Sequence, residues 1–77
     1  MMPIFIVKKI VTYDWDSPDV HHIVVTTDMD IAAKVYSEVA SGCKWKENAD
    51  VEIWMHNCQV HGGPVMDEFF SKVTYSK

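Results

Sequence analysis

Residues 27–42 form the one long stretch of this chain in which hydrophobic positions recur with the period of an α-helix. These positions fall on one helical face: Ile31, Ala32, Val35, Tyr36 and Val39. Thr27 can cap the first free amide groups, and Gly42 is a typical C-terminal stop. Asp28 and Asp30 suit the positive end of the helix dipole. The pattern predicts one long helix against which the rest of the chain packs.

Three further stretches have the pattern of β-strands. Residues 3–13 are apolar on both faces apart from Lys8 and Lys9, which predicts a central strand. Residues 20–27 are rich in the β-branched residues that favour strands. Residues 51–58 alternate with a period of two, which predicts a half-buried strand with one apolar face: Val51, Ile53 and Met55.

The last part of the chain follows a strong break at Gly62-Gly63-Pro64. Beyond it, over residues 65–73, the apolar residues recur at helical spacing: Met66, Phe69, Phe70 and Val73. Proline is well suited to a helix start, and Asp67 and Glu68 fall in the first turn. We expect a short C-terminal helix, with a fourth strand over residues 69–75 as the alternative.

The order of these elements predicts the topology of the sheet. A right-handed crossover from the second strand through the long helix places the third strand beside the first. We therefore expect a single α+β domain over residues 1–77. Its core is a three-stranded antiparallel sheet of order 2-1-3, with the long helix on one face. The other face must be covered by the C-terminal segment or by another molecule.

Parts of this layout resemble small, uncharacterised β-β-α-β domain proteins of phages and bacteria. The resemblance rests on an opening strand, an acidic turn, a strand end and a helix: Ile4-Phe5-Ile6-Val7, residues 14–19, Val25-Thr26-Thr27 and Ala32-Ala33. It covers residues 3–58. It implies a fold and a phage origin, and it supplies no catalytic residue.

Composition and charge narrow the classes of partner. The net charge is −4, and all seven basic residues are lysines. Phosphate backbones are bound by clustered lysine and arginine, so we expect no direct nucleic-acid binding. No apolar run approaches the ~20 residues that span a bilayer, and the N-terminus lacks the pattern of a signal peptide. We expect a cytoplasmic protein that binds no membrane, located in the host cytoplasm if a phage encodes it.

The strongest metal-binding pattern is a cysteine and histidine set. Its members are of the types that zinc prefers in tetrahedral sites: Cys43, His56, Cys58 and His61. The spacing lacks the paired C-x-x-C knuckles of a typical zinc domain. We therefore expect no cofactor and free thiols, and keep a zinc-stabilised domain as the alternative function.

Two other polar groups have simpler interpretations. His21 and His22 are adjacent on a strand and point to opposite faces, so we interpret them as polar residues of an edge strand. The spacing of Asp14, Asp16 and Asp19 is similar to that of a calcium loop, but the segment lacks the glycine and the closing glutamate of such a loop. An acidic turn that contacts solvent or a partner fits them better.

The tryptophans suggest a binding surface. Trp15 and Trp45 lie in predicted loops, and Trp54 lies on the polar face of the third strand. Exposed tryptophans flanked by charge are typical of interaction hot spots. The alternative is that the C-terminal segment packs onto Trp54. We predict a partner-binding set: Asp14, Trp15, Asp16, Asp19, Trp45, Trp54 and His56.

No sequence pattern indicates catalysis. The serines lack a G-x-S-x-G setting, and no glycine-rich phosphate loop is present. The leading hypothesis is a noncatalytic accessory protein that binds a basic or nucleic-acid-binding protein and can inhibit it. We also expect a homodimer through the open sheet face, because so small a domain buries little surface alone. A dimer that sequesters a small ligand in a cleft lined by Trp54 is a second alternative.

Overall fold

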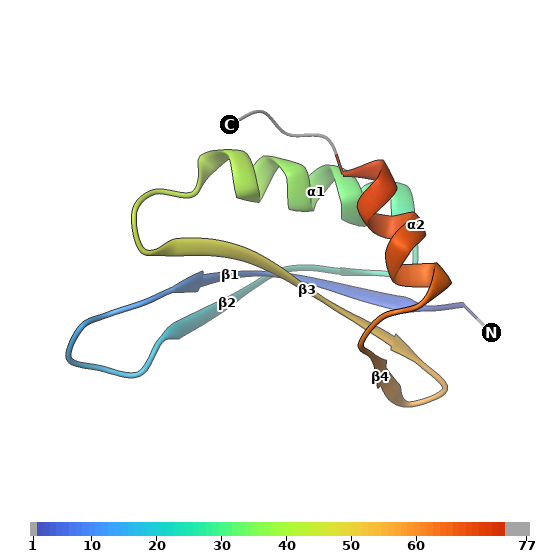
Figure 1. The fold of residues 1–77 in the computed structure, drawn as a ribbon, viewed down its shortest axis with the longest axis horizontal. Coiled ribbons are helices and arrows are strands. Elements are labelled where there is room, and N and C mark those ends of the chain that lie inside the picture. Colours follow the sequence, from blue (N-terminus) through green and yellow to red (C-terminus); the bar gives the residue numbers. More distant parts are fainter. Residues whose placement is uncertain (1, 74–77) are drawn as a thin grey trace.

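The computed structural model describes residues 2–73 as one sheet with two helices (Figure 1). The elements run in the order β1-β2-α1-β3-β4-α2. The strands span Ile4–Val11 (β1), Asp19–Thr26 (β2), Glu47–Met55 (β3) and Cys58–Val60 (β4). The helices span Met29–Gly42 (α1) and Pro64–Lys72 (α2). No helix within these residues has the length and apolar character needed to span a membrane.

The sheet is antiparallel throughout, with strand order β2-β1-β3-β4. This confirms the α+β class and the predicted order 2-1-3, and it adds a fourth strand. β4 arises because the predicted third strand does not continue to Cys58. His56 and Asn57 instead adopt φ angles of 52° and 64°, and Met55 pairs with Cys58 across a two-residue turn. Two positive φ angles match the twist of antiparallel strands, so the hairpin closes tightly.

Helix α1 begins at Met29, one residue later than a cap at Thr27 predicts. The side chain of Asp28 is the cap, accepting hydrogen bonds from the backbone N–H groups of Asp30 at 2.9 Å and Ile31 at 3.2 Å. The expected cap at Thr27 is therefore wrong. Ile31 is 49% exposed, and the most buried positions of the helix are its smaller residues: Ala32, Ala33 and Ser37. Small side chains let the helix lie close to the sheet.

The core lies between the helices and one face of the sheet. Its buried side chains come from β1, β3 and both helices: Phe5, Val7, Val51, Ile53, Ala32, Ala33 and Phe69. Phe69 of α2 stacks on Phe5 with ring centroids 5.6 Å apart, and it meets Tyr36 of α1 edge-on at 5.7 Å. These contacts hold α2 beside α1, on the same face of the sheet (Figure 1).

The position of α2 corrects two expectations. The C-terminal helix is confirmed, so the alternative strand is wrong for residues 69–72; its last residues, 74 and 75, lie outside the described part of the chain. The described C-terminal segment also leaves the second face of the sheet uncovered, and it does not pack onto Trp54. Phe69 contacts Phe5. Trp54 pairs with Ile4, the residue before Phe5, so the side chains of Trp54 and Phe5 lie on opposite faces of the sheet.

We expect Phe69→Ala to lower the free energy of unfolding by about 3–5 kcal/mol, because it removes a buried ring and leaves a cavity between three elements. Urea unfolding followed by circular dichroism measures this. Phe70→Ala is the matched control and should cost less, since the neighbouring ring is 43% exposed although it makes T-shaped contacts with Phe69 and Tyr36. Equal losses for the two variants would contradict the assigned position of α2.

Candidate protein-binding surfaces

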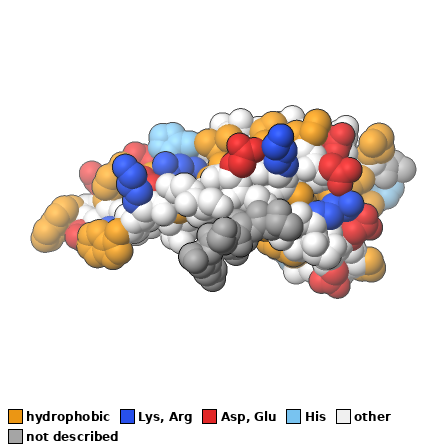
Figure 2. Space-filling view, turned by 90° about the horizontal axis from the view of Figure 1, so that it is seen from above, with side chains coloured by type: hydrophobic (Ala, Val, Ile, Leu, Met, Phe, Trp, Pro, Cys, Tyr) orange, Lys and Arg blue, Asp and Glu red, His pale blue; other side chains and the backbone are white. Residues whose placement is uncertain are grey.

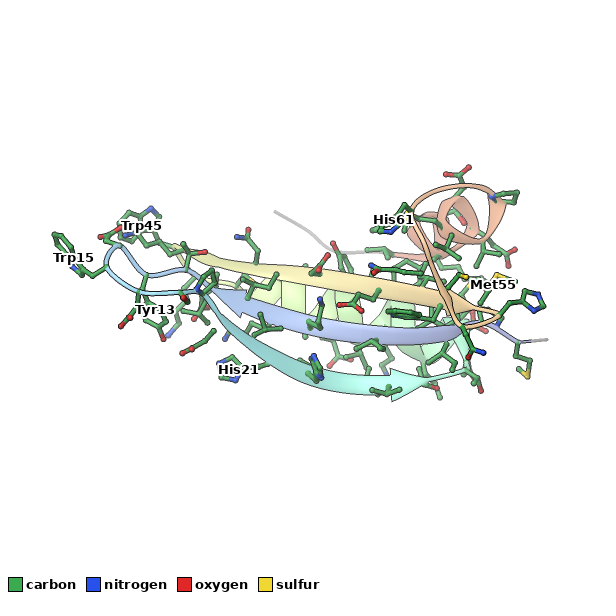
Figure 3. All side chains as sticks on the ribbon, turned by 90° about the horizontal axis from the view of Figure 1, so that it is seen from below. Tyr13, Trp15, His21, Trp45, Met55 and His61 are labelled. Atoms are coloured by element: carbon green, nitrogen blue, oxygen red, sulfur yellow. The ribbon has the colours of Figure 1, made fainter. Side chains whose placement is uncertain are left out.

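Two loops meet at one end of the sheet and carry the most exposed aromatic side chains. The β1–β2 loop contains Trp15, and the α1–β3 loop contains Trp45. Figure 3 shows both indoles at the same end of the molecule, with Tyr13 near them. Trp15 is 94% exposed and Trp45 is 85% exposed. We name this end the tryptophan tip and define it by its residues: Tyr13, Asp14, Trp15, Asp16, Trp45 and Lys46.

Contacts between the loops hold the tryptophan tip together. The backbone N–H of Thr12 donates to the carbonyl of Lys46 at 2.9 Å. The ammonium group of Lys46 forms an ion pair with Asp14 of the other loop. The same ammonium lies 4.5 Å from the ring centroid of Trp45, within the range of a cation–π contact. The two loops are thus joined by backbone and side-chain contacts from both sides.

The base of the tip is fixed by a turn within the second loop. The carboxylate of Glu47 accepts a hydrogen bond from the backbone N–H of Lys44 at 2.8 Å, and the N–H of Glu47 donates to the carbonyl of Lys44 at 2.9 Å. The first of these bonds lowers the pKa of Glu47. On the other loop, the Tyr13 hydroxyl donates to Asp19 at 3.0 Å, which raises the pKa of Tyr13.

The exposed indoles represent a large unused apolar area. A tryptophan covers roughly 200 Å² when it is buried. At ~25 cal/mol per Å², covering one of them contributes about 5 kcal/mol before the costs of association. Figure 2, seen from the helix side, shows hydrophobic side chains at this end and also along the helices and at the opposite end, with acidic and lysine side chains between them. The tip is set apart by its two indoles, which are the most exposed large hydrophobic side chains among the described residues.

A second surface is the face of the sheet that carries no helix. Its side chains alternate with the core residues along each strand, and we name it the open face. It comprises Ile4, Ile6, Lys8 and Ile10 of β1; Val20, His22 and Val25 of β2; and Asn48, Asp50, Glu52 and Trp54 of β3. Figure 3 views the molecule from this side, with α1 behind the strands and α2 beyond one edge of the sheet.

The centre of the open face is an ion cluster around Lys8. This lysine is only 8% exposed, although no helix covers it. Its ammonium group donates to Glu52 and lies 3.3 Å from Asp50. The indole N–H of Trp54 donates to the other oxygen of Glu52 at 3.0 Å. The bond to Glu52 raises the pKa of Lys8, and the bonds from Lys8 and Trp54 lower the pKa of Glu52.

One end of the open face contains a small pocket of about 280 Å³. It is lined mainly by apolar side chains: Met2, Ile4, Ile6, Trp54, His56 and Asn57. This volume lies just below the ~300–1,000 Å³ typical of small-molecule sites. It suits the insertion of a side chain better than the binding of a cofactor.

The structure divides the predicted binding set between these two places. Five of its members lie in or beside the tryptophan tip: Asp14, Trp15, Asp16, Asp19 and Trp45. Trp54 and His56 lie at the other end of β1, where Trp54 pairs with Ile4 and both residues line the pocket. At ~3.3 Å per residue, the length of β1 separates the two groups by about 25 Å. A small protein–protein interface therefore cannot include all seven residues of the predicted binding set.

The cysteine and histidine set is also spread over the fold. Cys43 caps the end of α1, and His56 lies in the β3–β4 turn. Cys58 and His61 are both exposed. Within residues 2–73, no three histidine, cysteine or acidic side chains gather closely enough to hold a metal ion. His21 and His22 pair with Lys9 and Lys8 respectively, so they point to opposite faces as expected.

The ion cluster was not recognised from the sequence, although its signal was present. Asp50 and Glu52 are two residues apart on one strand and therefore share a face. Once the first and third strands are paired, this face lies beside Lys8. Lys8 therefore interrupts the apolar pattern of the central strand because it pairs with Asp50 and Glu52.

Comparison of the chain with protein-family models, curated protein sequences and solved structures finds no match.

We expect Glu52→Gln to lower the free energy of unfolding by about 1–2 kcal/mol near neutral pH, since it weakens a charged hydrogen bond to a buried ammonium. The pKa of Glu52 is lowered in the folded state. Its contribution is therefore present above the ordinary carboxyl pKa and is lost as the pH falls through the lowered one.

Urea unfolding from about pH 6 to about pH 3 should show the difference between wild type and Glu52→Gln shrinking with acid. Glu38→Gln is the matched control, because this glutamate is exposed on α1. A difference that stayed constant across this range would show that the Lys8 cluster does not depend on the Glu52 charge.

Proposed function

We propose that this protein is a noncatalytic accessory protein that binds a protein partner through the tryptophan tip. The observation that carries the proposal is the pair of indoles, 94% and 85% exposed, on two loops joined to each other. An isolated exposed apolar side chain is ordinary on a protein surface. Two tryptophans at one end, on loops held by specific hydrogen bonds, provide the aromatic anchors typical of binding hot spots.

Preorganisation supports a binding role for these loops. The bond from Thr12 to Lys46 and the pair between Lys46 and Asp14 fix the loops before a partner arrives. Binding then costs less conformational entropy than it would for free loops. Tyr13 adds a further half-exposed ring whose hydroxyl is already held by Asp19.

The charge of the chain indicates the chemistry of the partner. The net charge is −4, and the tip and its margin hold three aspartates: Asp14, Asp16 and Asp19. Within residues 2–73, Asp16 forms no hydrogen bond or ion pair, so its charge faces solvent. A basic partner with an apolar pocket for indole rings fits this arrangement, and a nucleic-acid-binding protein has such a basic surface. By occupying that basic surface, this protein would inhibit its nucleic-acid-binding partner. Such a role suits a phage-encoded protein that acts in the host cytoplasm.

We expect the double variant Trp15→Ala/Trp45→Ala to lose binding, because each tryptophan anchor contributes about 2 kcal/mol or more, a factor of about 30 in Kd. Affinity capture with immobilised wild type, followed by quantitative mass spectrometry, identifies the proteins that depend on the tip. The affinity of the purified candidate is then measured by calorimetry. Its Kd should rise with salt, because the partner is basic.

The matched control is Val20→Ala/Val25→Ala, which removes exposed apolar area from β2 and leaves the tip intact. It should bind as wild type does. Proteins captured equally by wild type and by the tryptophan double variant would count against the proposal, as would a partner whose affinity follows the β2 variant. A fluorescent DNA oligonucleotide should show no binding to the wild type at physiological salt.

A further inference from the structure

The open face carries exposed apolar side chains that suit burial against another molecule. Both helices lie on the opposite face, so neither helix covers its apolar residues. Several are substantially exposed: Ile4 at 42%, Val20 at 50% and Val25 at 60%. The molecule measures 40 × 28 × 19 Å, so this face belongs to a thin slab of one sheet layer and one helix layer.

The charged groups at the centre of the open face are already paired with one another. Lys8 is paired with Asp50 and Glu52, and Glu52 also accepts the indole N–H of Trp54. Burying a charge is costly when it has no partner, and much less so when its hydrogen bonds are made beforehand. Among the described residues, no buried side-chain nitrogen or oxygen lacks a hydrogen-bond partner. The face can therefore be covered without leaving the Lys8 ammonium unpaired.

The free edge of β2 is less suited to association than the open face. The register of β1 and β2 shifts between Val7 and Lys8, because Val24 pairs with Val7 and His22 with Lys8. Ile23 lies between them as an extra residue. Such a bulge interrupts the regular row of backbone groups and opposes edge-to-edge pairing of sheets.

The size of the open face suits a symmetric dimer. Three strands of about eight residues, with β4 beside them, present about 400–500 Å² per copy at ~4.8 Å between strands and ~3.3 Å per residue. Two copies would bury about 800–1,000 Å², which reaches the ~1,000 Å² lower limit for a specific interface only at its upper end. The pocket of about 280 Å³ at one end offers a place for an apolar side chain of the facing copy.

We propose that a second copy of this chain packs on the open face to give a homodimer with the layers helix, sheet, sheet and helix. Stacked sheets lie about 10 Å apart, so the hydrophobic side chains of the two open faces interdigitate. The contact is isologous, with the same strands contributing from each copy. It lies on a different surface from the tryptophan tip and does not depend on the function proposed for that tip.

Sedimentation equilibrium of the wild type from about 1 µM to about 200 µM should show a monomer–dimer equilibrium, since an interface of this size gives modest affinity. Val25→Glu places an unpaired carboxylate in the interface and should raise the dimer Kd at least about 100-fold. Ile31→Glu is the matched control. Ile31 is 49% exposed on α1, away from the open face, and its variant should dimerise as wild type does.

A second readout removes dependence on one variant. In Trp15→Phe/Trp45→Phe, Trp54 is the one remaining tryptophan and lies half-buried on the open face. Its emission should move to shorter wavelength as the protein concentration rises, because the facing copy shields it from water. This variant and Trp15→Ala/Trp45→Ala should both dimerise as wild type does. Loss of partner binding without loss of the dimer would separate the two proposals.

Three results would overturn the dimer. The first is a wild type that remains monomeric at the highest concentration. The second is Val25→Glu that is folded by circular dichroism and dimerises as strongly as wild type. The third is a concentration-dependent dimer in which the emission of Trp54 does not change, which would place the contact on another surface. If the purified wild type is monomeric and a different protein covers its open face, the dimer proposal is likewise wrong.

Discussion

The fold depends on one constraint: the central strand β1 is hydrophobic on both faces, and the described helices cover only one. Phe69 stacks on Phe5 and also makes an edge-on contact with Tyr36, and these two contacts hold α2 beside α1. Both helices therefore bury the same face of the sheet. This arrangement forms a complete core from few residues, and it also leaves the isoleucines of the opposite face exposed or half-buried.

The two surfaces that result are built by different physical means. At the tryptophan tip, the loops are joined to each other and the indoles are almost fully exposed, so the apolar area is available to a partner at once. On the open face, the central lysine is nearly buried and its charge is compensated by Asp50 and Glu52. A surface with internally paired charges is suited to close packing, whereas projecting rings are suited to insertion into a pocket.

The local patterns of the chain were good guides to its elements. The periodicity of residues 27–42 predicted α1, and the two-sided apolar character of residues 3–13 placed β1 at the centre of the sheet. The errors lie at element ends, where competing residues decide. Asp28 takes the capping position expected for Thr27, and His56 and Asn57 turn the chain where alternation alone predicted a continuing strand.

The sequence by itself determined the class of every element except β4 and the order of the first three strands, because these follow from local periodicity and chain connectivity. It also determined that the central strand is apolar on both faces. Only the tertiary structure decided which face α2 covers, because that depends on one contact between residues far apart in the chain, Phe5 and Phe69. For the same reason, only the fold brings Trp15 to the same end as Trp45 and sets Trp54 apart from both. Side-chain spacing assigns a residue to a face, whereas long-range packing decides what that face meets.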